Sequence, residues 1–277
     1  MRQYGIIGYP LDHTFSPKIH LAAYRLLKMD AEYKKIEIEP SQFVRKIKAL
    51  KSGSWSGFNV TIPYKEKITE YLDELDPTAE MIGAVNTIAV NPTNGRWKGY
   101  NTDYNGFLKP IRAFLAEIRS CLIFGAGGAS RAVVSSLLNE CDPIHVVIVN
   151  RTESKATNLV SHLQNLSAAR IEFMKYNETE QIRNKMDIIV NTTSLGMGEA
   201  IDKYPADPVK FCHDRTVVYD LIYNPEESRF LKMAREAEMF TINGLPMLIG
   251  QAEAGFEIMT GNPFPEILAA RLMQELK

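Results

Sequence analysis

The sequence predicts an α/β fold, because stretches with the residue pattern of strands alternate with stretches of helical periodicity along the chain. A second observation is that the apolar stretches in the second half are short, continuous and rich in β-branched residues. This composition is typical of a parallel sheet that is covered on both faces. The third observation is the length of 277 residues, which exceeds the size of a usual single core and predicts two domains.

The expected elements follow from these patterns. In the first hundred residues we expect strands at 4–7, 34–38, 55–60, 87–90 and 97–100, with helices at 17–28, from 41 onward and from 64 onward. A helix at 104–118 leads into the second half, where we expect strands at 122–124, 144–149, 186–190 and 217–221 and a helix at 129–138. The last residues, 251–276, have the pattern of two amphipathic helices that are broken at Gly261 and Pro263.

Charge and composition narrow the class of protein. Basic and acidic residues nearly balance, with a formal net charge of −1, and no basic run predicts a surface for nucleic acid. No apolar run approaches the length that crosses a bilayer, and the first residues, MRQYGIIG, have the pattern of a strand and not of a signal sequence. We therefore expect a cytoplasmic protein with no membrane partner. Cys121, Cys141, Cys212 and the five histidines lack the spacing of metal ligands, so no metal is expected.

A glycine-rich turn lies between an expected strand and an expected helix in the run CLIFGAGGASRAVVSSLL, which begins at Cys121. Gly125 and Gly127 permit a tight turn and a close approach of the backbone to a ligand, and the N–H groups at the helix start suit a pyrophosphate. Ser130 replaces the third glycine of the dinucleotide-binding pattern. A turn of the same shape without a ligand is the alternative interpretation.

The next strand, 144–149, runs into Asn150, Arg151 and Thr152. A protein that binds NAD has an acidic residue at about this position for the ribose 2′-hydroxyl, and none is present here. The planar guanidinium of Arg151 matches a 2′-phosphate, with Thr152 as a further donor and Lys155 one helical turn on. We therefore expect NADP and not NAD as the cofactor. A solvated arginine at a strand end is the alternative.

Polar side chains gather at strand ends before the glycine-rich turn, in GFNVTIPYK at 57–65 and GYNTD at 99–103. Strand ends in an α/β domain point into a crevice where small ligands bind. The side chains that could converge there are Asn59, Thr61, Lys65, Asn86, Asn101 and Asp103. Each also has a structural explanation when taken alone, for example Asn59 and Asn101 as turn residues and Asp103 as a helix N-cap.

Taken together, these motifs resemble those of the shikimate dehydrogenase family over almost the entire chain. The matching motifs occur in the family's order and are GFNVTIPYK, GAVNT at 83–87, GYNTD, GAGGASRA, NRT at 150–152, NTTSLGM at 191–197 and GLPMLIGQ at 244–251. The resemblance implies an NADP-linked oxidoreductase that interconverts 3-dehydroshikimate and shikimate in chorismate and aromatic amino-acid biosynthesis. It also implies a substrate-binding α/β domain at 1–102 and 241–277, to which the last helices return, and a Rossmann-type NADP(H)-binding domain at 103–240.

The resemblance implies roles for individual residues. Lys65 and Asp103 match the catalytic pair, in which we expect the Lys65 ammonium to give a proton to the substrate carbonyl oxygen during hydride transfer and Asp103 to steer it. Thr61, Asn86 and Gln251 match contacts to the ring hydroxyls, Thr14 and Ser16 contacts to the substrate carboxylate, and Tyr223 a position between substrate and cofactor. The expected cofactor contacts are Gly125, Ala126, Gly127, Gly128, Ala129, Asn150, Arg151, Thr152, Lys155, Thr192, Met197, Gly244 and Met247.

Several alternatives stay open at this stage. Ser16 followed by Pro17 is also an ordinary N-cap with proline at the first helical position. Thr14 stands where the family usually has serine, which leaves the choice between shikimate and quinate open and makes a broader quinate/shikimate dehydrogenase the alternative enzyme. A protein of another class, a non-catalytic NADP-binding regulator, would retain the fold. The substrate is expected to be a small molecule, and the chain to be a monomer or a homodimer.

Overall fold

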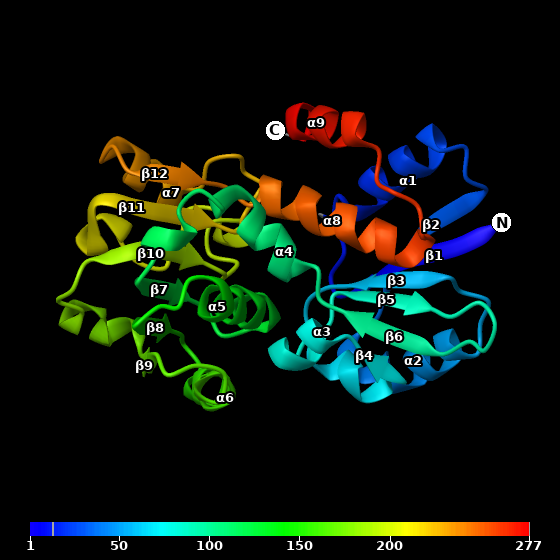
Figure 1. Ribbon diagram of the computed structural model, residues 1–277, viewed down its shortest axis with the longest axis horizontal. Coiled ribbons are helices and arrows are strands. Elements are labelled where there is room, and N and C mark those ends of the chain that lie inside the picture. Colours follow the sequence, from blue (N-terminus) through cyan, green and yellow to red (C-terminus); the bar gives the residue numbers. More distant parts are fainter. Residues whose placement is uncertain (13, 277) are drawn as a thin grey trace. The chain divides into compact units, whose positions relative to one another are not determined.

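The computed structural model describes residues 1–12 and 14–276 (Figure 1). The chain forms two compact units, of which the first consists of Met1–Gly106 together with Ile249–Glu275. The second consists mainly of Phe107–Leu248. The division into a substrate-binding domain and a cofactor-binding domain at residues 102 and 240 stays a prediction.

The first unit is built on a mixed sheet of six strands in the order β2-β1-β3-β5-β6-β4. β1 pairs in parallel with β2 and β3, whereas β5 is antiparallel to β3 and β6. The strands are β1 (Arg2–Gly8), β2 (Ala31–Glu37), β3 (Gly57–Val60), β4 (Glu74–Leu75), β5 (Thr87–Val90) and β6 (Trp97–Tyr100). Because β6 runs parallel to β3, the residues after both strands lie at the same edge of the sheet.

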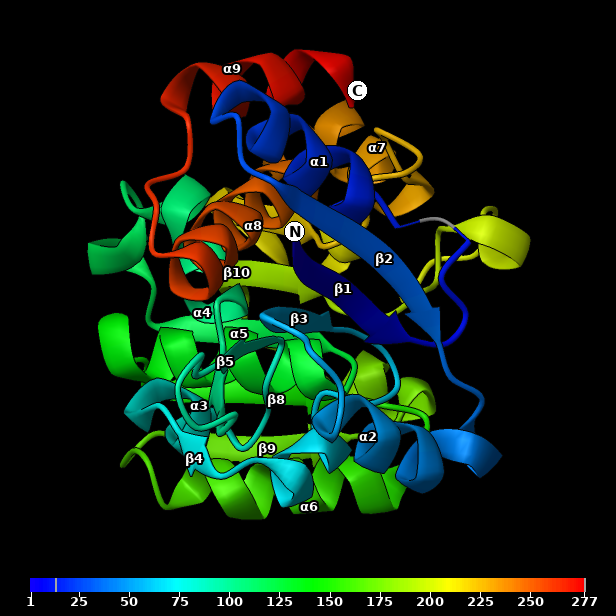
Figure 2. The ribbon, with the colours of Figure 1, turned by 90° about the vertical axis from the view of Figure 1, so that its right-hand side faces the viewer.

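Helices of the first unit include α1 (Ser16–Leu26), α2 (Phe43–Lys51), α3 (Pro77–Ile82) and α9 (Glu266–Glu275). At the start of α3, which the sequence analysis did not anticipate, the carboxylate of Asp76 caps the helix by accepting a hydrogen bond of 3.0 Å from the N–H of Thr78, and Pro77 lies in the first turn. The helix ends at Gly83, whose φ of 70° is left-handed. α9 lies beside α1 in both views (Figures 1 and 2).

The core of the first unit is an apolar cluster beneath the sheet. Phe58 in β3 is fully buried, and the centre of its ring lies 5.0 Å from those of Trp55 and Trp97. Two helices connect the units: α4 (Asp103–Leu108) and α8 (Leu245–Thr260).

The second unit is a parallel sheet in the order β12-β11-β10-β7-β8-β9 (Figure 1). This is the order of a doubly wound dinucleotide-binding fold, with its switch point between β7 and β10. The elements are β7 (Ser120–Phe124), α5 (Gly128–Glu140), β8 (His145–Val149), α6 (Glu153–Gln164), β9 (Arg170–Met174), β10 (Met186–Asn191), β11 (Cys212–Asp220), α7 (Arg229–Glu236) and β12 (Phe240–Ile242). The predicted α/β fold class with a Rossmann-type sheet is confirmed.

Two expected helices were wrong in extent. The helix expected at 104–118 ends at Leu108, because Pro110 has no N–H to continue the ladder, and short 3-10 turns at Lys109–Ile111 and Leu115–Glu117 replace it. The helix expected from 64 onward is a 3-10 turn at Lys67–Tyr71. It stops there because Leu72 becomes extended, which leads the chain into β4 beside β6.

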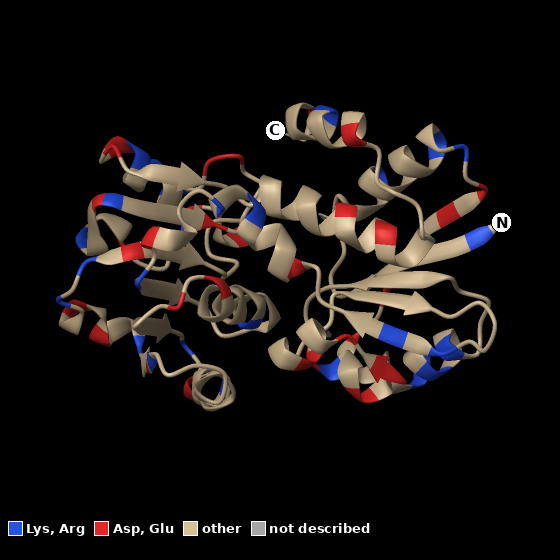
Figure 3. Cartoon of the chain, viewed as in Figure 1, with Lys and Arg blue, Asp and Glu red and all other residues tan. Residues whose placement is uncertain are grey.

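Charged residues of both signs are mixed along the elements (Figure 3). Within residues 1–12 and 14–276, no helix combines the length and apolar character that a bilayer crossing requires.

Candidate active site

The centre of the candidate site in the first unit is an ion pair between Lys65 and Asp103. Lys65 follows β3, and Asp103 is the first residue of α4, directly after β6. The distance from Lys65 Nζ to Asp103 Oδ2 is 2.5 Å, and the side chains are 14% and 6% exposed. An ammonium held by a largely buried carboxylate can deliver a proton to a bound substrate at a defined position.

Asn86, which lies between α3 and β5, fixes the second oxygen of Asp103. Its Nδ2 donates to Asp103 Oδ1 over 2.9 Å and to Gln251 Oε1 over 3.4 Å, and it also bonds Thr102 Oγ1 over 3.0 Å. Its Oδ1 accepts a hydrogen bond of 2.8 Å from the N–H of Thr102. Four of the residues expected at the site, Lys65, Asp103, Asn86 and Gln251, therefore form one hydrogen-bonded network.

Thr14 and Ser16 form a separate pair at the start of α1. Thr14 Oγ1 lies 3.2 Å from Ser16 Oγ and accepts a hydrogen bond of 3.3 Å from the N–H of Ser16. The N-cap interpretation of Ser16 is wrong, because Ser16 is the first helical residue and Phe15 occupies the cap. Among the described residues, no side chain makes a capping hydrogen bond to α1, so the Ser16 hydroxyl is not used in capping the helix.

Thr61 directly follows β3, and its backbone ties two chain segments together: its N–H donates to Ile7 O over 2.9 Å, and its carbonyl accepts from the N–H of Tyr64 over 2.9 Å. Its side chain is partly exposed.

Two further strand-end residues are turned into the protein. Asn59 accepts a hydrogen bond of 2.6 Å from the Tyr33 hydroxyl and donates one of 3.2 Å to Thr87 Oγ1. Asn101 is a turn residue: it donates to Ala84 O over 2.8 Å and accepts from the N–H of Asp103 over 3.1 Å. The N-cap interpretation of Asp103 is wrong, since Asp103 lies in the first turn of α4 and Asn101 receives its N–H.

In the second unit, the glycine-rich turn joins β7 to α5. Gly125 has a left-handed φ of 113°, and a Cβ atom built there would lie 2.3 Å from Thr192 Oγ1. Gly127 caps α5, is exposed, and has open space where a Cβ would stand. Ser130, in place of the third glycine, is fully buried and donates a hydrogen bond of 2.8 Å to Gly125 O. The turn therefore presents backbone N–H groups at a helix start, which fits a pyrophosphate.

The residues expected at the 2′-phosphate follow β8. Arg151, Thr152 and Lys155 are exposed, and Thr152 is the N-cap residue of α6. Asn150 Nδ2 donates a hydrogen bond of 2.8 Å to Thr152 O, which holds the turn. An exposed guanidinium at the carboxyl edge of the sheet fits a cofactor that carries a further phosphate. Gly128, Ala126 and Ala129 lie in or directly after the glycine-rich turn.

The residues expected at the nicotinamide end lie at the same edge, after β10, β11 and β12. Thr192 donates two hydrogen bonds to Phe124 O, of 2.8 Å from its N–H and 2.7 Å from its hydroxyl. Gly244 packs so closely that a Cβ atom would lie 2.0 Å from Leu221 O. Met197 and Tyr223 are partly exposed, and Met247 is buried in α8.

Sequence reasoning missed two buried residues at this edge, Asp220 and Asn191. Asp220, at the end of β11, accepts hydrogen bonds from Asn191 Nδ2 (3.0 Å), the N–H of Ile222 (3.1 Å) and the hydroxyl of Ser228 (2.5 Å). Burial raises its pKa from 3.8 to about 7, against the lowering effect of these hydrogen bonds. Both residues stand beside motifs that the sequence singled out, in NTTSLGM and DLIYNP, and that proximity is the signal that could have found them.

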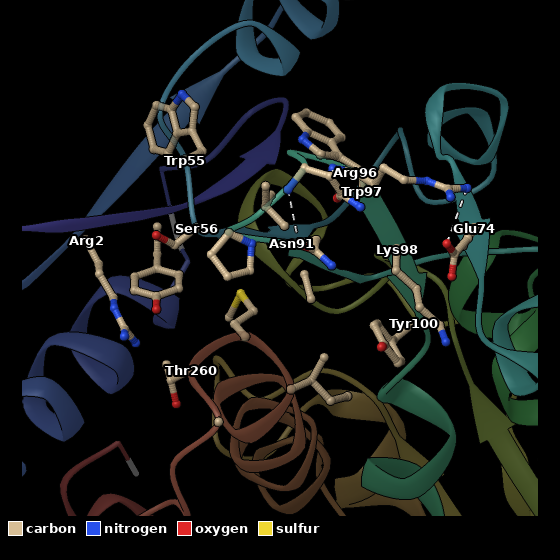
Figure 4. Close-up of a pocket in the computed structure, with 18 residues that line it drawn as sticks. Arg2, Trp55, Ser56, Glu74, Asn91, Arg96, Trp97, Lys98, Tyr100 and Thr260 are labelled. Atoms are coloured by element: carbon tan, nitrogen blue, oxygen red, sulfur yellow. Dashed lines mark hydrogen bonds and ion pairs between the residues drawn. The ribbon is translucent and has the colours of Figure 1, made fainter.

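A cavity of about 470 Å³ in the first unit is distinct from this network (Figure 4). Its lining includes Arg2, Trp55 and Trp97 and an ion pair of 3.3 Å between Arg96 and Glu74. Lys65 and Asp103 do not line it. In the described part of the chain, no group of three or more His, Cys, Asp and Glu side chains is arranged to hold a metal ion.

The doubly wound sheet with its glycine-rich turn and the lysine–aspartate pair of the other unit define a class of protein, the dinucleotide-dependent dehydrogenases. Comparison with known proteins specifies the family. The model of the shikimate dehydrogenase substrate binding domain matches residues 6–88, and that of shikimate / quinate 5-dehydrogenase matches residues 113–201. The chain belongs to the shikimate dehydrogenase family, and the predicted resemblance is confirmed.

Individual relatives cover nearly the whole chain. A shikimate dehydrogenase (NADP(+)) of Methanosphaera stadtmanae is 38% identical over 99% of this chain and 96% of its own length. The crystal structure of a shikimate dehydrogenase in complex with NADP⁺ is 34% identical, covers 100% of this chain and 96% of the other, and has a TM-score of 0.86. A quinate dehydrogenase from Corynebacterium glutamicum in complex with NAD is 27% identical, covers 99% and 97%, and also has a TM-score of 0.86.

Asp220 predicts a pH dependence of stability. Below pH 3.8 the side chain is protonated in both the folded and the unfolded state, so its raised pKa has no effect on stability. Between pH 3.8 and about 7 the unfolded state loses the proton more readily, so the free energy of unfolding falls as the pH rises. Asp220→Asn removes this penalty. Raising the pH from about 4 to about 8 should therefore destabilise the wild type relative to the variant by up to about 4 kcal/mol. Urea unfolding followed by far-UV circular dichroism measures this difference. A difference that does not change with pH would contradict the prediction.

Proposed function

We propose that this chain is an NADP-dependent dehydrogenase that interconverts 3-dehydroshikimate and shikimate, a step in chorismate and aromatic amino-acid biosynthesis. The observation that carries the proposal is the network of Lys65, Asp103, Asn86 and Gln251, because it supplies both a proton donor and a set of polar groups at one strand edge. A pocket built from such groups selects a hydroxylated ring, since an analogue without the hydroxyls would leave buried polar groups unpaired. Membership of the family supports the same reaction.

Each expected site residue of the first unit has a proposed role. Lys65 gives its proton to the carbonyl oxygen as that oxygen gains negative charge, and Asp103 holds the ammonium in place. Asn86, Thr61 and Gln251 bind the ring hydroxyls. The hydroxyls of Thr14 and Ser16 bind the carboxylate at the start of α1, where the helix dipole also favours an anion. Tyr223, in the second unit, is proposed as a further substrate contact.

The second unit is proposed to bind NADP(H). The glycine-rich turn takes the pyrophosphate, Asn150, Arg151, Thr152 and Lys155 take the 2′-phosphate, and Thr192, Met197, Gly244 and Met247 take the nicotinamide end. When bound, the reduced cofactor supplies the hydride. The names of the relatives support NADP as the cofactor. We also propose that residues 1–102 and 241–277 form the substrate domain and residues 103–240 the cofactor domain.

Two finer points complete the proposal. The chain is expected in the cytoplasm, since its three cysteines are free thiols and its cofactor is a cellular reductant. It is expected to act as a monomer or a homodimer.

A panel of shikimate and quinate against NADP⁺ and NAD⁺ tests the proposed function directly. We expect the largest kcat/KM with shikimate and NADP⁺, measured from the absorbance of the reduced cofactor. Thr14, with one methyl group more than serine at the proposed carboxylate site, and the similarity to a quinate dehydrogenase make quinate the alternative substrate. Higher kcat/KM with quinate would establish that alternative, and absence of turnover with every pair would overturn the enzyme assignment.

Lys65→Ala tests the proton donor. We expect kcat to fall by about 10²–10⁴, because a general acid acts mainly in the transition state, while the KM for shikimate changes much less. The matched control is Lys67→Ala, which removes an exposed lysine two residues further on and should leave both constants unchanged. Equal effects on kcat and KM would show that Lys65 is only a binding residue.

Arg151→Ala tests the choice of cofactor. The variant should bind NADP⁺ about ten- to a hundredfold more weakly, because a hydrogen bond between charged groups is lost, and should bind NAD⁺ as before. Arg170→Ala is the control, since Arg170 is an exposed arginine at the start of β9, at the opposite edge of the same sheet. Similar weakening of both cofactors by Arg151→Ala would refute the assignment of this turn.

A further inference from the structure

The buried carboxylate of Asp220 lies where two loops of the second unit meet. One loop follows β10 and carries Thr192 and Met197, and the other follows β11 and carries Tyr223. Asp220 is fully buried at the end of β11. Its Oδ1 accepts hydrogen bonds from Asn191 Nδ2, at the last residue of β10, over 3.0 Å and from the N–H of Ile222, in the loop after β11, over 3.1 Å. A single oxygen atom therefore joins the starts of the two segments.

Asn191 extends this link into the first loop. Its Oδ1 accepts hydrogen bonds from the N–H and the hydroxyl of Thr193, of 3.0 and 2.7 Å, and its Nδ2 also donates to Leu195 O over 3.1 Å. These bonds define the backbone on both sides of Thr192, so Asn191 shapes the loop. Asp220 in turn holds the amide of Asn191 in one orientation.

Ile222 extends the link into the second loop and beyond it. Its carbonyl accepts a hydrogen bond of 2.8 Å from the N–H of Gly244, and Gly244 packs against Leu221 so closely that no side chain fits there. The position of Gly244 therefore depends on the segment that begins at Asp220. Every residue proposed at the nicotinamide end, apart from Met247, lies on one of the segments joined in this way.

We infer that Asp220 is a positioning residue for the reaction: through Asn191 it holds the loop of Thr192 and Met197, and through Ile222 it holds Gly244, so that these residues can bind the nicotinamide end of the cofactor. This inference rests on the proposed function, because the roles of Thr192, Met197, Tyr223 and Gly244 are part of that proposal. Asp220 acts through these residues and needs no contact of its own with the cofactor.

The amino edge of the same sheet provides a matched comparison. Asp187, near the start of β10, accepts hydrogen bonds of 2.8 Å from the N–H groups of Arg119 and Ser120, and its Oδ1 lies 2.9 Å from His213 Nε2. It therefore also joins several segments of the second unit. It does so at the other end of β10 from Asn191, so its loss should affect stability without moving the cofactor loops.

The experiment compares binding of two ligands to the whole protein by titration calorimetry: NADP⁺, and adenosine 2′,5′-bisphosphate, which lacks the nicotinamide half. Asp220→Ala should weaken NADP⁺ by about tenfold or more, because buried donors on both loops lose their acceptor, and should leave the bisphosphate unchanged. Asp220→Asn keeps an oxygen toward Asn191 and Ile222 and should restore NADP⁺ binding. Asp187→Ala should leave the ratio of the two affinities unchanged.

Asn191→Ala removes the same link from the neighbouring strand and should reproduce the selective loss, which tests the inference even if Asp220→Ala does not fold. The inference would be overturned if the Asp220→Ala and Asn191→Ala variants weakened both ligands equally or left NADP⁺ binding unchanged. An equally selective loss of NADP⁺ binding in Asp187→Ala would also overturn it. Failure of the proposed function is seen separately, because in that case the wild type would not turn over shikimate with NADP⁺.

Discussion

The negative charge of Asp103 is the constraint around which the polar side chains of the first unit are arranged. A carboxylate that is almost fully buried is costly unless donors surround it, and here it receives the ammonium of Lys65 and the amide of Asn86. These donors come from segments after β3 and before β5, while Asp103 itself follows β6. Satisfying one charge therefore brings together three strand ends, and with them polar groups that are proposed to bind the substrate.

The second unit contains the same asparagine–aspartate arrangement, but the charge next to the aspartate differs. In both units the amide nitrogen of an asparagine donates to a buried aspartate, over 2.9 Å from Asn86 and 3.0 Å from Asn191, while its oxygen receives a loop N–H. Asp103 also faces a cation, whereas Asp220 is held by neutral donors, and burial raises its pKa to about 7. The ion pair of Asp103 suits proton transfer to a substrate, and the neutral hydrogen bonds of Asp220 suit the positioning of loops.

The sequence predicted the parts of the structure that depend on local pattern. The alternation of strands and helices, the limits of β5 and β6, and the glycine-rich turn all follow from residue type and spacing. The direction of the strand-end side chains did not follow from local pattern, since the inward-turned Asn59 is bonded to Tyr33 and Thr87, which lie far from it in the sequence. The proposed role of Asp220 likewise depends on the pairing between β10 and β11. The edge strands β4 and β12 have only two and three residues, too few to show a pattern of their own.

The hydroxyl of Ser130 has a consequence for how such turns are recognised. Its hydrogen bond to Gly125 O links the two ends of the turn. The turn therefore keeps its shape with a serine at the position where the common pattern has glycine. A search that demands three glycines would reject this protein, although the architecture around the helix start is intact. A description of such turns by the hydrogen bonds that their carbonyl groups accept would find relatives that a sequence motif misses.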